Sequence, residues 1–245
     1  MQIITIANQK GGTAKSTTAA ALAQAAADQG KKVLAIDLDP QGNLSFFLAA
    51  DTSRPGSFEI LSGTAAAADT IQRSGSRIDA IPASWNLATI TSSKGSARRL
   101  QRALEPIKES YDLIIIDTPP TAGELQYNAL QASTGLIIPL QADIVSLHGL
   151  YQISDTAHQI QTSNPALEIT GTILTRHNGR SIIAQQMTQN IMDKSKELQI
   201  PFLGIVREAV TVKEAQTLQR SLYEYAPKSN PARDYKIILK KILEA

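Results

Sequence analysis

The sequence predicts an α/β fold in which a single doubly wound, mostly parallel sheet is covered by helices on both faces. Short apolar runs rich in β-branched residues alternate along the chain with helical stretches, which is typical of a parallel sheet. Runs such as 113–116 are apolar throughout rather than alternating, which indicates strands buried on both faces. The chain of 245 residues has the size of one such domain, and we expect residues 1–245 to form it.

The expected elements follow in chain order. Strands are predicted at 3–7, 33–36, 78–82, 113–116, 136–139, 169–174 and 202–206. The first helix, about 15–29, is dominated by alanine, the best helix former, and Gly30 stands where helices commonly end. Segment 51–77 is rich in Ala, Ser, Thr and Gly, so we expect short helices and loops there.

Residues 8–18 read Asn-Gln-Lys-Gly-Gly-Thr-Ala-Lys-Ser-Thr-Thr and lie between the first strand and the first helix. Such a turn directs backbone N–H groups and the positive end of the helix dipole at one point, where a polyphosphate can bind. In the P-loop pattern, Lys15 would reach the β/γ-phosphates and the Ser16 hydroxyl would join a Mg²⁺ shell. The expected nucleotide contacts in this loop are Lys10, Gly11, Gly12, Thr13, Ala14, Lys15, Ser16 and Thr17.

Two positions depart from the usual P-loop pattern, which has glycine where Gln9 and Ala14 stand. Glycine before the P-loop lysine often adopts a backbone conformation that a Cβ atom penalises by ~1 kcal/mol. Ala14 could therefore reduce nucleotide affinity or turnover. A nucleotide-binding switch with weak hydrolysis is an alternative to a fully active enzyme.

Carboxylates close two of the predicted strands, at the edge where doubly wound sheets bind ligands. Asp37 and Asp39 follow the second strand, and Asp117 follows the run 113–116. A strand-ending aspartate alone is more often a turn cap, but beside a phosphate loop it is typical of a Mg²⁺ site. Asp37 is equally compatible with a role in the Mg²⁺ shell and a purely structural role.

Composition excludes several classes of function. The chain has no cysteine, which rules out thiol catalysis, disulfides and cysteine-ligated clusters. No run approaches the roughly 18 apolar residues of a spanning helix, and the first strand begins too early for a signal peptide, so we expect a cytoplasmic protein. His148 and Trp85 each stand alone among apolar neighbours, and we assign both to structural roles.

The charge is unevenly distributed along the chain. Residues 176–245 contain 12 Lys/Arg and 7 Asp/Glu, a balance of +5, whereas the preceding residues contain 12 and 15, a balance of −3. A basic carboxy-terminal part suggests an anionic partner, although a solvated mixed surface would give a similar count.

These motifs together resemble the ParA family of partition ATPases, small members without an amino-terminal helix-turn-helix. The extra Lys10 in a Lys-Gly-Gly-x-x-Lys-[Ser/Thr] loop resembles the deviant Walker A motif of the ParA/MinD superfamily, which lacks the glycine replaced by Gln9. The resemblance extends over essentially the whole chain and also rests on 37–43, 117–120 and the stretch Leu-Gln-Arg-Ala-Leu-Glu-Pro-Ile at 100–107. It implies the fold of a P-loop NTPase.

The resemblance also implies a mechanism. ATP and Mg²⁺ would be the cofactors, Asp39 would orient the attacking water, and Ser16, Asp37 and Asp117 would serve the metal. Lys10 would reach the partner subunit's nucleotide, so that two protomers enclose two ATP molecules and hydrolyse them slowly, with Lys10, Lys15 and Asp39 as catalytic residues. Segment 175–180 follows a predicted strand and could line the base pocket, with Asn178 as a candidate adenine contact. Segment 206–210, which includes Arg207, occupies the other family position beside the base, although the family usually has proline where Val206 stands.

Members of this family bind DNA without sequence preference as ATP dimers and work with a ParB-like DNA-binding adaptor, which implies a nucleoid-associated protein. Phosphate contacts need only clustered cations and depend steeply on salt. The candidate DNA contacts are Arg207, Lys213, Arg220, Lys228, Arg233 and Lys236.

Two rival interpretations remain at this point. Residues 233–245 could form a basic amphipathic helix on a membrane, as in MinD, with Tyr235, Ile238, Leu239 and Ile242 on its apolar face. We favour the same segment as a last helix packed on the sheet, because its apolar face has ordinary width. A metabolic enzyme or tyrosine kinase of the same superfamily is the other rival; the kinase would need a flexible tyrosine cluster, which the helical pattern around Tyr223, Tyr225 and Tyr235 does not favour.

Overall fold

The computed structural model describes residues 1–74, 78–92, 95–179 and 182–244, and these form one eight-stranded sheet in the order β3-β4-β2-β5-β1-β6-β7-β8. Seven of the strands run parallel to one another: β1 (Gln2–Ile6), β2 (Val33–Asp37), β4 (Ile78–Ile81), β5 (Leu113–Asp117), β6 (Gly135–Leu140), β7 (Glu168–His177) and β8 (Phe202–Arg207). Only the edge strand β3 (Gln72–Ser74) is antiparallel. The predicted doubly wound, mostly parallel sheet is therefore confirmed.

The structure corrects the prediction in one segment. Segment 51–77, where we expected short helices and loops, contains α3 (Ser57–Ser62) and α4 (Ala67–Thr70) but also the strand β3. Three residues are too few to show the alternation by which a strand is recognised, so β3 left no sequence signal. The seven predicted strands are all present, and β7 extends three residues beyond its predicted end at 174.

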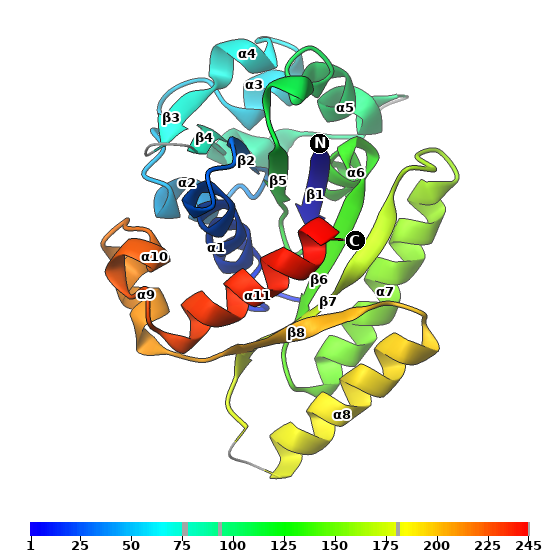
Figure 1. Cartoon of the computed structure of the whole chain (residues 1–245). Helices are drawn as coiled ribbons and strands as arrows, with labels where there is room; N and C mark the ends of the chain where they lie inside the picture. The colour runs from blue at the N-terminus through cyan, green and yellow to red at the C-terminus, as the bar shows by residue number, and fades with distance from the viewer. Residues whose placement is uncertain (75–77, 93–94, 180–181, 245) are drawn as a thin grey trace.

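Helices cover both faces of the sheet (Figure 1). One face carries α1 (Lys15–Asp28), α2 (Asn43–Phe47), α9 (Val210–Thr217), α10 (Leu222–Tyr225) and α11 (Asn230–Glu244). The opposite face carries α3, α4, α5 (Arg99–Leu104), α6 (Glu124–Ala132), α7 (Ile144–Gln161) and α8 (Ile182–Glu197). Short 3₁₀ turns lie at Trp85–Thr89, Ser96–Arg98 and Lys108–Ser110.

The alanine-rich helix α1 lies close against the centre of the sheet. Six of its alanines are buried, because a methyl side chain allows the helix backbone to approach the strands. The helix ends one residue before the predicted limit. Gly30 then adopts φ +88°, and the Lys31 N–H donates to the Ala26 carbonyl at 3.1 Å, which is the Schellman pattern.

Strand β1 occupies the middle of the sheet, between β5 and β6. From β1 the chain crosses to β2 on one side, whereas β6, β7 and β8 extend the sheet on the other, so the winding reverses at β1. Ligands of doubly wound folds bind at such a switch point, outside the carboxyl ends of the strands. The loop after β1 thus meets Asp37 and Asp117, which are partners in register across β2 and β5.

The carboxy-terminal helix α11 belongs to the core. Tyr235, Ile238, Leu239 and Ile242 are each 1% exposed and pack in the cluster that includes α1 and β8. The apolar face that the membrane interpretation needed is therefore covered by protein. Among the described residues, no helix has the length and apolar character needed to cross a membrane.

His148 and Trp85, to which we assigned structural roles, are not part of the core. Trp85 is 69% exposed at the start of its 3₁₀ turn, and His148 is exposed on α7. Their neighbours Leu87 and Leu150 are fully buried. The apolar surroundings in the sequence reflect the inward face of each element, whereas these two side chains lie on the outward face.

Two adjacent isoleucines on α11 test its packing. Replacing Ile238 with alanine should lower the free energy of unfolding by about 2–5 kcal/mol, because it leaves a cavity in the core. Ile237→Ala, at a residue that is 58% exposed, should change it by about 0.5 kcal/mol or less. Urea denaturation of both variants measures the difference, and equal effects would contradict the burial of this face.

Candidate nucleotide-binding site

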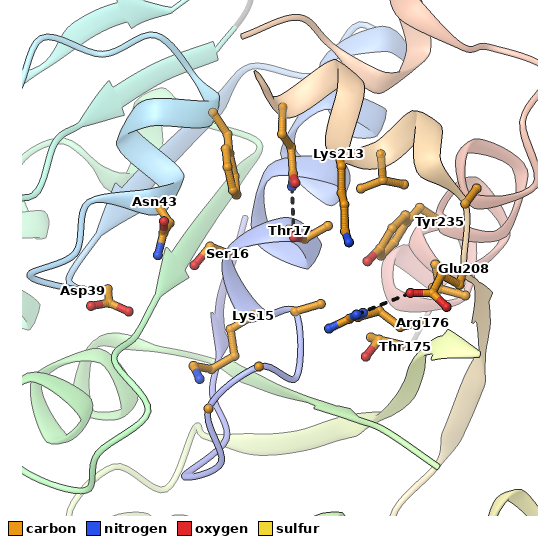
Figure 2. A pocket seen from close by; sticks show the side chains of 18 of the residues that line it. Lys15, Ser16, Thr17, Asp39, Asn43, Thr175, Arg176, Glu208, Lys213 and Tyr235 are labelled. Atoms are coloured by element: carbon orange, nitrogen blue, oxygen red, sulfur yellow. Dashed lines mark hydrogen bonds and ion pairs between the residues drawn. The ribbon is translucent and has the colours of Figure 1, made fainter. Parts of the chain in front are cut away.

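A cavity of about 440 Å³ opens at the carboxyl edge of the sheet (Figure 2). One end is formed by the loop after β1 and the start of α1, and Asp39 lies beside it. The other end is formed by the last residues of β7, the residues at and after the end of β8, α9, and Tyr235 of α11. The cavity therefore joins the predicted phosphate loop to the carboxy-terminal third of the chain.

The phosphate loop has the backbone conformation in which we expected the Cβ of Ala14 to be unfavourable. Ala14 has φ 63° and ψ 36°, in the left-handed region, where it caps α1 and its carbonyl accepts a hydrogen bond from the Thr18 N–H at 2.8 Å. A Cβ in this region costs roughly 1–2 kcal/mol relative to glycine. The chain thus folds its phosphate loop with a strained alanine at this position.

Lys15 lies over the loop with only 6% of its surface exposed. Its Nζ donates to the Lys10 carbonyl at 3.2 Å. Burial lowers the pKa of Lys15, and the charges of Asp117 and Asp39 oppose this shift in part. An anion placed at the loop would stabilise the charged lysine.

Lys10 is held within its own chain. Its Nζ forms an ion pair with Asp143, the N-cap of α7, and lies 3.3 Å from the Ser146 hydroxyl. Burial opposes the ionisation of Asp143, but the hydrogen bonds from Lys10 and Ser146 hold its pKa below the usual range. The Lys10 side chain therefore points toward α7 in this structure.

Asp37 is buried and fully occupied by hydrogen bonds. Its carboxylate accepts from the Ser45 N–H at 2.8 Å, the Ser45 hydroxyl at 2.7 Å and the Asp39 N–H at 3.0 Å. Burial raises its pKa to about 6, against the effect of the Ser45 hydrogen bonds. These contacts fix the turn between β2 and α2, and they favour the structural alternative for Asp37.

Asp117 is also buried, but its carboxylate is not satisfied as that of Asp37 is. It is 0% exposed, and neither carboxylate oxygen accepts a hydrogen bond of good geometry from the described residues. Burial and then the charge of Asp37 raise its pKa well above the usual range, and Ser16 and Lys15 oppose this only in part. An unpaired buried carboxylate needs an explanation, and a hydrated cation would supply one.

The residues present fit a Mg²⁺ ion that takes few protein ligands, and they do not form a site in which protein side chains alone surround a metal. Within the described part of the chain, no group of three or more His, Cys, Asp or Glu side chains is arranged to hold a metal ion. Mg²⁺ commonly takes one or two protein ligands and completes its shell with water and phosphate oxygens. Asp117 and the Ser16 hydroxyl would be the protein's contribution.

The far end of the cavity contains residues of the two segments, 175–180 and 206–210, that we expected beside the base. The Thr175 hydroxyl lies 3.0 Å from the carbonyls of both Thr13 and Leu140 and donates to one of them. Arg176 follows with φ 51°, and its guanidinium pairs with Glu208 of the adjacent strand end at 3.3 Å. Both residues lie in segments that the sequence placed beside the base, but no sequence signal singled out either one.

The two expected base contacts are placed differently. Asn178 is exposed and lies outside the cavity, in an adjoining hollow with His177 and Gly179, because β7 continues to His177 and carries Asn178 beyond the cavity wall. Arg207 lines the cavity, but its guanidinium donates to Asp234 at 3.0 and 2.6 Å. The structure brings Gly11, Gly12, Ala14, Lys15, Ser16, Thr17 and Asp39 together around the cavity and places Thr13, Asp37 and Asp117 behind its wall.

Comparison with known proteins extends this picture. Residues 1–169 match the AAA domain family. The chain is 32% identical to the chromosome-partitioning ATPase Soj of Thermus thermophilus, over 98% of this chain and 94% of that protein. It is 33% identical to the chromosome partitioning protein ParA of Caulobacter vibrioides, over 99% and 94%. The chain belongs to the ParA family of partition ATPases.

Among solved structures, this ParA family member is similar to cobyrinic acid a,c-diamide synthase from Mycobacterium smegmatis with bound ATP analog and magnesium. The TM-score is 0.86, with 28% identity over 100% of this chain and 95% of that one. The likeness shows that the chain has the same fold as that synthase.

The basic residues of this ParA family member are partly engaged within the fold. Arg207 pairs with Asp234, Lys236 pairs with Asp28 at 2.6 Å, and the Arg220 guanidinium lies 5.9 Å from the centre of the Tyr225 ring. Lys213 lines the cavity. Of the six predicted DNA contacts, only Lys228 and Arg233 are exposed away from the cavity without a side-chain partner among the described residues.

Glycine substitutions at Ala14, the N-cap of α1, and at Ala19, within α1, test the strain in the loop. Ala14→Gly should raise the free energy of unfolding by up to about 1 kcal/mol, because glycine has no Cβ and adopts the left-handed conformation without its steric cost. Ala19→Gly, in the buried interior of α1, should lower it by about 1 kcal/mol. Urea denaturation distinguishes the two signs; a destabilised Ala14→Gly variant would show that the alanine is not strained.

Proposed function

We propose that this chain is a DNA-partition ATPase that dimerises around ATP and Mg²⁺, binds DNA without sequence preference in that state, and is released from DNA on hydrolysis. The observation that carries the proposal is the buried, unpaired carboxylate of Asp117 behind the phosphate loop. A carboxylate in that position is explained by a cation, and the loop beside it is explained by a polyphosphate.

The residues of the site would divide the chemistry as follows. The loop backbone and Lys15 bind the phosphates, and Ser16 and Asp117 hold Mg²⁺, which neutralises charge that develops during phosphoryl transfer. Asp39 is 6% exposed, lines the cavity, and accepts a hydrogen bond from the Gln41 N–H at 3.0 Å, so one carboxylate oxygen is positioned to orient a water molecule. The Asp37 carboxylate supports Asp39 by accepting a hydrogen bond from the Asp39 backbone N–H.

Lys10 supports the dimeric part of the proposal. Its side chain is 20% exposed and is bound to Asp143 and Ser146 at the start of α7. To reach a second subunit's nucleotide it must leave these partners, so dimerisation would exchange one set of contacts for another. Hydrolysis would then be slow in the monomer, and an adaptor resembling ParB would stimulate it at the nucleoid.

The structure supports one of two alternative functions and not the other. A switch with weak hydrolysis is favoured by one observation, the strained backbone of Ala14 in the phosphate loop. A membrane-associated positioning ATPase is not favoured, because the apolar face of α11 is buried.

Removing Lys10 tests the dimer. Lys10→Ala should abolish ATP-dependent dimerisation and hydrolysis while leaving nucleotide binding by the monomer largely intact, whereas Lys15→Ala should lose nucleotide binding as well. Light scattering with ATP and Mg²⁺ measures dimerisation, and phosphate release measures hydrolysis. Lys240→Ala, at a side chain that is 73% exposed on α11, is the matched control. A Lys10→Ala protein that dimerises and hydrolyses normally would remove the two-subunit mechanism.

DNA binding is tested by its dependence on ATP and salt. With ATP and Mg²⁺ the protein should bind a non-specific duplex, and affinity should fall steeply as salt rises, because phosphate contacts release counterions. Replacing Lys228 and Arg233 with alanine should weaken binding and reduce the slope of log K against log salt by about 1 for each cation that no longer neutralises a phosphate. Lys31→Ala, between α1 and β2 at the opposite edge of the sheet, should leave the slope unchanged. Binding that needs no ATP would contradict the proposal.

A further inference from the structure

Strained backbone lies on both sides of one contact between the phosphate loop and β7. Five described residues other than glycine have positive φ. Three of them stand just after the ends of helices, where this conformation is common: Ala49, Gln199 and Gln219. The other two are Ala14 and Arg176. They directly follow Thr13 and Thr175, which meet where the Thr175 hydroxyl lies 3.0 Å from the Thr13 carbonyl. Strained conformations persist only where their surroundings fix them, so this contact requires an explanation.

Two side chains from the sheet reach successive carbonyls of the phosphate loop. Gln141, the residue after β6, donates its side-chain amide to the Gly12 carbonyl at 2.9 Å. Thr175 of β7 is 1% exposed, and its hydroxyl reaches the next carbonyl, that of Thr13. The two contacts therefore fall on the two peptide groups that lead into Ala14.

These contacts also set the direction of the backbone N–H groups. A peptide group is planar and trans, so its N–H points opposite to its carbonyl. Because the Gly12 and Thr13 carbonyls point toward Gln141 and Thr175, the N–H groups of Thr13 and Ala14 point away from those two side chains. Successive N–H groups in a turn form a concave site for an anion. The two side chains thus orient donors that a phosphate group needs.

The alanine in this loop gives these contacts a particular importance. Gly12 adopts φ +80° at little cost because it has no Cβ, whereas Ala14 has a Cβ at φ 63°. Without support from the sheet, the segment that ends at Ala14 would favour a relaxed conformation. The apparent affinity for a phosphate would then fall in proportion to the fraction of molecules that keep the binding conformation.

We propose that Thr175 and Gln141 are positioning residues that hold the phosphate loop in its binding conformation and so compensate for the alanine at position 14. Each acts through a carbonyl of the loop rather than on the phosphates themselves. The loop is then formed before the ligand arrives, and Ala14 does not disable it. This inference rests on the proposed ATP-binding function.

The experiment measures the affinity of the full chain for ATP and for tripolyphosphate, each with Mg²⁺, by calorimetry. Thr175→Val removes the hydroxyl and should weaken the binding of both probes by about two- to tenfold, the effect of one hydrogen bond. Thr175→Ser keeps the hydroxyl and should bind as the wild type does. In ATP turnover the KM of Thr175→Val should rise while kcat stays unchanged, because the bound loop is the same in both proteins.

Two further variants support this comparison. Gln141→Leu should behave as Thr175→Val does, at a side chain that is only partly buried. Thr172→Val is the matched control: its hydroxyl is also buried on β7 but lies 3.1 Å from the Ser195 hydroxyl rather than at the loop. It should leave the affinity for both probes unchanged, even if it lowers the free energy of unfolding.

Coupling to position 14 tests the compensation itself. Ala14→Gly alone should leave both affinities within about twofold of the wild type, because the loop is already held. When Ala14→Gly is combined with Thr175→Val, the loss should shrink to less than about twofold, because glycine keeps the left-handed conformation without support. Equal losses with and without Ala14→Gly, or unchanged affinity in both Thr175→Val and Gln141→Leu, would overturn the inference. A wild-type protein that binds neither probe would instead overturn the proposed function.

Discussion

The turn from β1 into α1 is the constraint on which the site depends. β1 is buried in the centre of the sheet, and the chain must leave it and enter α1 within a few residues. Asn8 anchors this turn: its side-chain amide donates to the Pro139 carbonyl at 2.7 Å, and its oxygen accepts from the Lys10 N–H at 2.9 Å. With the loop fixed to β6 in this way, its backbone N–H groups face the edge where the other strands end.

The two buried carboxylates near this loop differ in how many hydrogen bonds they accept. Asp37 has three hydrogen-bond donors and stabilises the turn after β2, whereas Asp117, its partner in register on β5, has none of good geometry among the described residues. Burial is the largest cause of the raised pKa of both carboxyl groups. Two neighbouring carboxylates in such a place are costly unless a cation joins them, so the residues that oppose folding here also favour the binding of a metal–nucleotide complex.

The carboxy-terminal third completes the cavity and also uses much of its own positive charge. Gln216 of α9 donates to the Thr17 hydroxyl at 2.9 Å, and Tyr235 of α11 lies 3.1 Å from the Thr18 hydroxyl, so both helices are tied to the start of α1. The ion pairs of Arg207 and Lys236 with aspartates hold α11 against β8 and α1. The net charge of this region therefore overstates the number of cationic side chains that remain to contact an anionic partner.

The sequence by itself determined the seven parallel strands, the phosphate loop, the alanine-rich helix and the three aspartates, because each is encoded by residues within one short stretch: an apolar run, a spacing, or a polar residue that ends a strand. It also located the strain at Ala14, which follows from a backbone conformation that the loop requires. Only the tertiary structure decided which aspartate is satisfied, where Lys10 points, and which residues of 175–180 and 206–210 line the cavity. Lys10 meets Asp143 across 133 residues, and Arg176 meets Glu208 across 32. Contacts between segments so far apart leave no periodicity and no spacing in the chain, because they depend on the order of strands in the sheet rather than on neighbours in sequence.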